Sequence, residues 1–341
     1  MIYKKHIRHI NAYNRFLPLY SVLLFFLLPI YSYADSNLSP VEKNVMLHVV
    51  VKNGDVQAVK ALLNNRGVDV NSKDQDGKTP LYIAAYNGHV EVVKELLANK
   101  GIQLNLQNVN GDTPLHITAQ KGHVEVVKEL LANKNIQVNL QNNNGTTPLH
   151  IAIYTGHVAV VKELLANKNI QVNLKEKDGF TPLYIAAQEG HVEVVKKLLA
   201  NKGIQLNLQN VNGDTPLLIT AQKGHVAVVK ELLANKNIQV NLQNKLGTTP
   251  LHCAAQKGHV EVVKELLANK NIQVNLQNKL GTTPLHCAAK HGYIQVCKSL
   301  IQDERVVANI KNIFGQTPLD LAKKNNHHMC INLLKRAITL G

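Results

Sequence analysis

A Thr-Pro pair recurs every 34 residues along most of this chain, and this period constrains the fold more than any other feature. The eight threonines are Thr79, Thr113, Thr147, Thr181, Thr215, Thr249, Thr283 and Thr317. A divergent ninth copy precedes them, because the residues from Val45 align with those from Thr79 and put Gly54 one period before Gly88. One copy cannot bury an apolar face alone, so the copies must stack on one another.

Each repeat contains the pattern of two short helices and a loop. In the third repeat, Thr113 fits an N-cap and Pro114 fits the first position of a helix that Gly122 ends. Residues 124–131 carry an apolar stripe opposite Glu and Lys, which predicts a second, amphipathic helix. An Asn-rich stretch, 133–144, and a glycine turn lead to the next Thr-Pro. The expected fold is an all-α solenoid of helix-turn-helix units with hairpin-like loops, which we call fingers.

Aromatic residues make up only 4% of the chain, and Trp is absent. Eight of the 15 aromatic residues lie in the first 34 positions. The rest of the chain must therefore build its core from Leu, Val, Ile and Ala. With 45% hydrophobic and 18% charged residues the chain is not a disordered one. The scarcity of aromatics argues against a large enzyme with one deep core.

The amino terminus has the pattern of an export signal. Residues 1–15 are basic, residues 16–34 are uncharged, and Ser32 and Ala34 are small residues before a cleavage point at Asp35. We expect a signal peptide over 1–34 and a short lead-in over 35–40. The alternative is an uncleaved anchor in the membrane through residues 16–34, whose length is close to that of a membrane span although two prolines interrupt it. In both cases the rest of the chain is exported, secreted or periplasmic.

The segments TPLHITAQKGHVEVVKELL (113–131) and TPLHCAAQKGHVEVVKELL (249–267) resemble the ankyrin repeat family, and their copies extend the resemblance over residues 41–341. The nine repeats are then 41–74, 75–108, 109–142, 143–176, 177–210, 211–244, 245–278, 279–312 and 313–341. The connection ANKNIQVN is one residue longer than is usual in this family. Asn135 and Asn169 stand there in place of Gly, and Asn tolerates the left-handed conformation next best. We expect an altered loop and an intact solenoid.

The 16 histidines and four cysteines do not form a recognisable reactive site. Most histidines follow the 34-residue period, and the resemblance implies that they bridge loops and neighbouring repeats. The pair His327 and His328 is placed outside the period, and one adjacent pair is a weak signal for a metal site. Stacked helices hold Cys253 and Cys287 too far apart to bridge, whereas a bridge between Cys287 and Cys297 remains open. No C-x-x-C, P-loop, nucleophile elbow or H-E-x-x-H occurs, so we expect no enzyme activity, no cofactor and no metal.

The resemblance implies that a partner binds the concave side, formed by finger tips and the exposed face of each first helix. Aromatic and aliphatic residues fall in these otherwise polar slots, and lysines accompany them. The candidate partner-binding residues are Tyr86, Val109, Tyr154, Phe180, Val211, Lys223, Leu246, Lys257, Leu280, Lys290, Ile313 and Phe314. The alternative is that drifting copies tolerate exposed apolar residues.

The net charge of +15 falls to +11 without residues 1–34, since these carry four basic residues and no acid. The remaining lysine cluster fits an acidic protein partner. Nucleic acid is disfavoured because these slots lack Arg, and lysines of the second helices stand beside Glu. We therefore expect a monomeric protein-binding scaffold, and the resemblance together with the export signal implies a secreted bacterial factor. The alternatives are a membrane-tethered or periplasmic scaffold and a binder of nucleic acid or an anionic surface.

Overall fold

The computed structural model of the chain describes residues 38–340, and within that range every regular element is an α-helix. These residues form two compact parts, an N-terminal part up to Gln137 and a C-terminal part from Val138. The predicted signal peptide, residues 1–34, lies outside the described range. Between residues 38 and 340, none of the helices has the length and apolar character needed to cross a bilayer.

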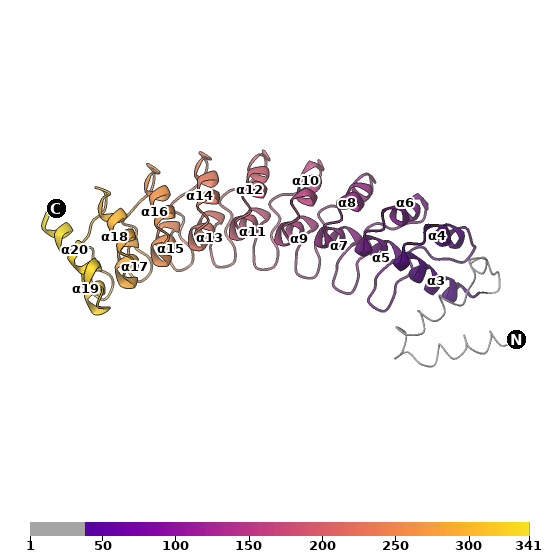
Figure 1. The fold of residues 1–341 in the computed structure, drawn as a ribbon, viewed down its shortest axis with the longest axis horizontal. Coiled ribbons are helices and arrows are strands. Elements are labelled where there is room, and N and C mark those ends of the chain that lie inside the picture. Colours follow the sequence, from indigo (N-terminus) through magenta and orange to yellow (C-terminus); the bar gives the residue numbers. More distant parts are fainter. Residues whose placement is uncertain (1–37, 341) are drawn as a thin grey trace. The chain divides into compact units, whose positions relative to one another are not determined.

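Helices come in pairs, a first and a second helix in each repeat (Figure 1). The N-terminal part contains α3 (Pro40–Asn53), α4 (Val56–Leu63), α5 (Pro80–Asn87), α6 (Val90–Ala98), α7 (Pro114–Lys121) and α8 (Val124–Leu131). The C-terminal part contains α9 (Pro148–Tyr154), α10 (Val158–Ala166), α11 (Pro182–Gln188), α12 (Val192–Leu199), α13 (Pro216–Lys223), α14 (Val226–Leu233), α15 (Pro250–Lys257), α16 (Val260–Leu267), α17 (Pro284–His291), α18 (Ile294–Ile301), α19 (Pro318–Lys324) and α20 (His328–Leu340).

The Thr-Pro pair starts each first helix from α5 onward, as the sequence predicts. In α15 the Thr249 hydroxyl accepts from the His252 amide at 3.4 Å, and Pro250 occupies the first turn. Gly258 ends the same helix in the left-handed conformation, with φ of 76°. The divergent first helix, α3, uses the same design, because Ser39 and Glu42 form a reciprocal capping box. Local capping therefore sets the start of each first helix.

Stacking of equivalent helices builds the core. Within the C-terminal part α13 packs on α15, α14 packs on α16, and the two helices of each pair pack on each other. Figure 1 shows the first helices of this part in one row, with the fingers projecting from it, and the second helices in another row. The predicted apolar stripes are buried; in α14, for example, Val228, Val229 and Leu232 have no exposed surface. The core is built almost entirely from aliphatic side chains.

The fingers are tight, hydrogen-bonded turns, and no strand forms among the described residues. In the finger after α14, the Asn244 amide donates to Thr248 O at 3.0 Å and the Gly247 amide donates to Asn244 O at 2.8 Å. Consecutive fingers of the C-terminal part also bond to each other; the Lys245 amide, for example, donates to Asn212 O at 2.9 Å. These contacts make the fingers of one part a linked row.

The connections after the second helices differ from the expectation. The left-handed conformation expected at Asn135 and Asn169 is wrong, because Asn326 is the one non-glycine residue with positive φ in the described range. A side chain supplies the turn instead: Asn133 Oδ1 accepts from the Asn135 amide at 3.0 Å. A second asparagine then links neighbouring repeats, since Asn139 Nδ2 donates to Asn169 O at 2.7 Å. The extra residue is absorbed by side-chain hydrogen bonds while the stack is kept.

Candidate protein-binding surface

Three apolar side chains occupy the same position on consecutive fingers of the C-terminal part. Leu246, Leu280 and Phe314 are 68%, 52% and 67% exposed, and we call them the finger strip. The equivalent residues of the other fingers are polar, namely Asp76, Asn110, Asn144, Asp178 and Asn212. Three exposed apolar tips in register on one part of the chain are typical of an interaction surface.

Side-chain hydrogen bonds fix the backbone at these tips. Asn244 Oδ1 accepts from the amides of Leu246 at 2.9 Å and Thr248 at 3.0 Å. The same arrangement holds the next two fingers through Asn278 and Asn312. The tips are therefore presented on an ordered backbone, which reduces the conformational entropy that binding would cost.

Backbone hydrogen bonds join the three fingers to one another. The Lys279 amide donates to Leu246 O at 3.0 Å, and the Ile313 amide donates to Leu280 O at 3.2 Å. The side chain of Gln277 also bridges two fingers, because its Nε2 donates to Gly281 O at 2.6 Å and to Lys311 O at 3.0 Å. The strip is thus held in register from finger to finger.

The other apolar candidates of the C-terminal part differ in how much of each side chain is exposed to solvent. Val211 and Ile313 are exposed next to the finger tips, and Tyr154 is also exposed. Phe180 is half-buried, because its ring stacks on Tyr184 with centroids 4.6 Å apart and an interplanar angle of 3°. One face of Phe180 is therefore already covered by its own repeat.

The remaining two candidates, Tyr86 and Val109, belong to the N-terminal part. Both are exposed. The Tyr86 ring holds the ammonium group of Lys121 at 4.4 Å from its centroid, which is a cation–π contact. The structure assigns ten of the twelve sequence-predicted residues to the C-terminal part, and the finger strip is the group that it brings into register.

Lysines surround the finger strip. Lys245 and Lys279 lie on the fingers themselves, and Lys223, Lys257 and Lys290 lie at the ends of α13, α15 and α17. We call these five the finger-side lysines. All five are exposed, and within residues 38–340 none forms an ion pair.

Lysines of the second helices are placed differently. Lys264 pairs with Glu261 at 2.7 Å, and Lys230 pairs with Glu265 of the next repeat at 3.3 Å. Their charge is therefore largely balanced within the chain. The positive potential of the C-terminal part is left uncompensated on the finger side.

The periodic histidines hold repeats together, as the sequence resemblance implies. His252 Nε2 donates to Thr282 O at 2.9 Å, and its Nδ1 accepts from the Thr249 amide at 3.3 Å. Burial lowers the pKa of His252 to about 4, although the bond to Thr282 opposes the shift. The buried ring is neutral and structural.

The histidines that follow the helix-ending glycines have a second periodic role. His259 Nε2 lies 3.0 Å from Gln222 O, one repeat earlier. His327 makes the same bond to Lys290 O at 3.1 Å, so placing it outside the period is wrong. Asn326, with φ of 59°, replaces the usual glycine before it and hides the match in sequence. His327 is thus part of the repeat architecture.

All four cysteines are free thiols. Cys287 and Cys297 are not joined, and the thiol of Cys297 is hydrogen-bonded to that of Cys330 in α20. Burial raises the pKa of Cys253 to about 12, so this thiol stays protonated and poorly nucleophilic. No cluster of three or more potential metal ligands occurs in the described part of the chain.

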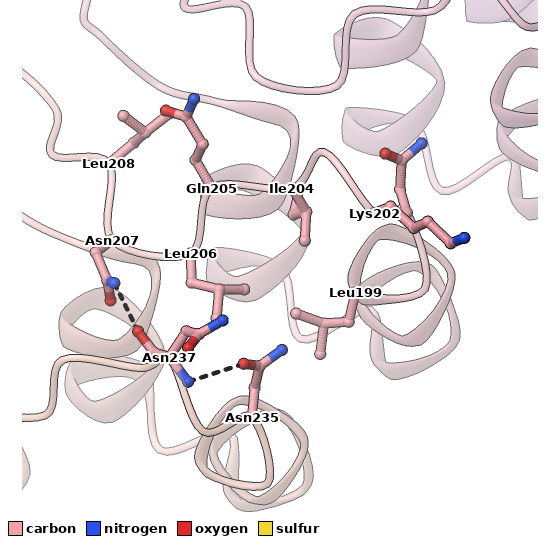
Figure 2. A pocket seen from close by; sticks show the side chains of 10 residues that line it. Leu199, Lys202, Ile204, Gln205, Leu206, Asn207, Leu208, Asn235 and Asn237 are labelled. Carbon is pink, nitrogen blue, oxygen red and sulfur yellow. Dashed lines mark hydrogen bonds between the residues drawn. The ribbon is translucent and has the colours of Figure 1, made fainter.

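One hollow lies on the connections, away from the finger strip. It has a volume of about 530 Å³ and is lined by Leu199, Asn201, Lys202, Ile204, Gln205, Leu206, Asn207, Leu208, Asn235 and Asn237. Figure 2 shows Asn207 donating to Asn237 O and the Asn237 amide donating to the Asn235 side chain. A similar hollow recurs at residues 272–277. These hollows follow the repeat, and amide groups that already bond one another line the first.

The stacked helix pairs place the chain in the class of helical repeat proteins. Comparison with protein-family models identifies the repeat family. Models described as ankyrin repeats match residues 47–142, 134–210 and 197–278, and a further ankyrin repeat model matches residues 266–322. The chain belongs to the ankyrin repeat family. A comparison with curated proteins found no match. Ankyrin repeats are in general protein–protein interaction modules, and proteins built from them are typically non-catalytic scaffolds.

Proposed function

We propose that the protein is an exported scaffold that binds a partner protein through the finger strip and the neighbouring ends of the first helices. The observation that carries the proposal is the exposure of Leu246, Leu280 and Phe314 at one position on three linked fingers. Nothing in the chain's own described surface covers these side chains. Exposed apolar groups on an ordered backbone gain most by burial against another molecule. Binding occurs by presentation of this surface, without a chemical step.

The strip is tested by a pull-down from the medium or cells into which the chain is exported. The variant carries Leu246→Asp, Leu280→Asp and Phe314→Ala. We expect this variant to capture at least about tenfold less partner than the unchanged chain. It loses three apolar contacts and gains two charges that a partner must desolvate. A matched variant carries Gln171→Asp, Gln205→Asp and Gln239→Ala on exposed positions of the connections. Equal capture by all three chains would contradict the assignment of the site.

Export is supported by the basic and then uncharged residues before Asp35. We expect mass spectrometry of the exported chain to find a new amino terminus near Asp35. An intact Met1 in the membrane fraction would favour the tethered scaffold in its place.

A further inference from the structure

The finger side of the last four repeats is strongly basic. Its fingers and first helices, between residues 211 and 324, carry seven lysines but only two carboxylates, Asp214 and Asp320. Both carboxylates are already engaged: Asp214 Oδ1 accepts from Asn244 Nδ2 at 2.8 Å, and Asp320 Oδ2 accepts from the Thr317 amide at 3.0 Å. Lysines therefore outnumber carboxylates on this side of the described chain, and none of the five finger-side lysines forms an ion pair there.

A lysine stands beside the apolar tip on two of the three fingers of the strip. Lys245 directly precedes Leu246, and Lys279 directly precedes Leu280. The linking bonds between fingers pass through these same residues, so lysine and leucine keep one register on both fingers. Further along each repeat, Lys223, Lys257 and Lys290 add charges at the helix ends. A partner on this surface meets apolar and cationic groups in turn.

The spacing of the fingers sets the shape of a matching partner. Stacked helices lie about 8–10 Å apart, and an extended chain advances about 3.3 Å per residue. An extended segment running along the fingers therefore passes one repeat for about every three residues. One apolar side chain in three can reach a tip, and the residues between can reach lysines.

We infer that the finger strip and the finger-side lysines bind an extended acidic segment of a partner protein, in which an apolar side chain recurs about every third residue. This inference rests on the proposed function and names the chemistry of its partner. Apolar burial supplies affinity, and the carboxylates supply orientation and exclude basic partners.

Helix capping offers a competing explanation for part of the charge. Lys223, Lys257 and Lys290 lie in last turns, where a cation stabilises the helix dipole. Lys245 and Lys279 lie on fingers and have no such role. α9 and α11 also end without any lysine in the last turn. Capping therefore leaves the lysines of the fingers unexplained.

Synthetic peptides test the inference by fluorescence anisotropy against the exported chain. The probe is a peptide of repeated Leu-Asp-Asp triplets, and the comparison peptides are repeated Ser-Asp-Asp and Leu-Lys-Lys triplets. We expect the Leu-Asp-Asp peptide to bind at least about tenfold more tightly than either of the others, and to weaken as salt rises. The triple variant Lys245→Glu, Lys279→Glu and Lys290→Glu should reverse the preference towards the Leu-Lys-Lys peptide.

A matched variant controls for net charge. Lys202, Lys236 and Lys270 are exposed on the connections, and their replacement by Glu changes the total charge equally. This variant should keep the preference of the unchanged chain, with circular dichroism confirming that both variants fold. Equal loss in the two variants would overturn the inference, as would binding of random-sequence DNA or phosphatidylserine vesicles as tight as that of the probe. If the peptides fail while the pull-down still depends on the finger strip, the proposed function stands and the acidic partner is wrong.

Discussion

Replacement of Gly281 by alanine is expected to lower the free energy of unfolding by about 3 kcal/mol, whereas the same change at Gly315 should cost about 1 kcal/mol. Both glycines sit in fingers with positive φ, 68° and 72°. A Cβ at Gly281 would lie 2.8 Å from the backbone nitrogen of Ile313 and 3.0 Å from Asn312 Cα. At Gly315 nothing lies within 4 Å. The difference between the two losses in the free energy of unfolding reports the steric contact between one finger and the next.

Urea denaturation of the two variants checks this expectation, and Gly315→Ala serves as the control for left-handed strain. The backbone at Ile313 cannot yield easily, because its amide holds Leu280 O at 3.2 Å. The Gly281 variant should therefore also weaken presentation of the finger strip. An equal loss of stability in both variants would mean that neighbouring fingers do not support each other.

The second large effect is a loss of stability in acid that depends on His252. The ring is buried and its pKa is lowered to about 4, whereas an unfolded histidine titrates near the ordinary value of 6.5. The unfolded chain therefore binds more protons between these values. The neutral His252 ring therefore makes its full contribution to the free energy of unfolding above pH 6.5. This contribution is lost as pH falls towards 4, and the total loss is about 3 kcal/mol.

The substitution His252→Leu separates the contribution of His252 to acid sensitivity from that of the other groups, and leucine already occurs at this repeat position. Leu218 occupies the slot of His252 one repeat earlier and is also buried. His252→Leu loses bonds to Thr249 and Thr282 and should be less stable at neutral pH, but its stability should fall less between about pH 6.5 and about pH 4. Urea midpoints across that range measure the difference. The same slope in both chains would show that His252 does not carry the acid sensitivity; His286, whose pKa burial also lowers, is the next residue to test.

Much of the fold follows from the sequence because each repeat carries its own signals. Thr249, Pro250 and Gly258 fix the limits of one helix through local capping, and the same residues recur at a constant spacing. The apolar stripe of the second helix then leaves stacking as the only way to bury it. Repetition turns weak local preferences into a firm prediction of the fold.

Side-chain roles within loops were harder to predict. The sequence places Asn133 in an Asn-rich loop and suggests a left-handed turn at Asn135, yet the Asn133 side chain closes this turn by accepting from the Asn135 amide. The Asn139 side chain bonds the next repeat through both of its polar atoms: Nδ2 donates to Asn169 O, and Oδ1 accepts from the Gln171 amide. The available signal was the recurrence of these asparagines every 34 residues, which composition alone does not distinguish from a polar loop.

The candidate surface could be outlined but not ranked from sequence. The slots for Leu246, Leu280 and Phe314 follow from the repeat register, and the structure adds their exposure and the bonds between their fingers. Phe180 and Tyr86 also fall in predicted contact slots, but ring contacts with Tyr184 and Lys121 occupy part of each. Phe180 contacts a residue of its own repeat and Tyr86 contacts a lysine about one repeat later, and both contacts depend on side-chain orientations that the pattern of residue types does not specify.

Site-specific photo-crosslinking tests the central claim most directly. A photoreactive phenylalanine analogue at Leu280 places the probe on the finger strip, and the same analogue at Gln239 places it on an exposed connection of the same part. Irradiation of the exported chain in its natural setting should give a covalent adduct with a partner protein from position 280 and none from position 239. Adducts from position 239 alone, or from neither position while a partner still copurifies, would contradict binding through the finger strip.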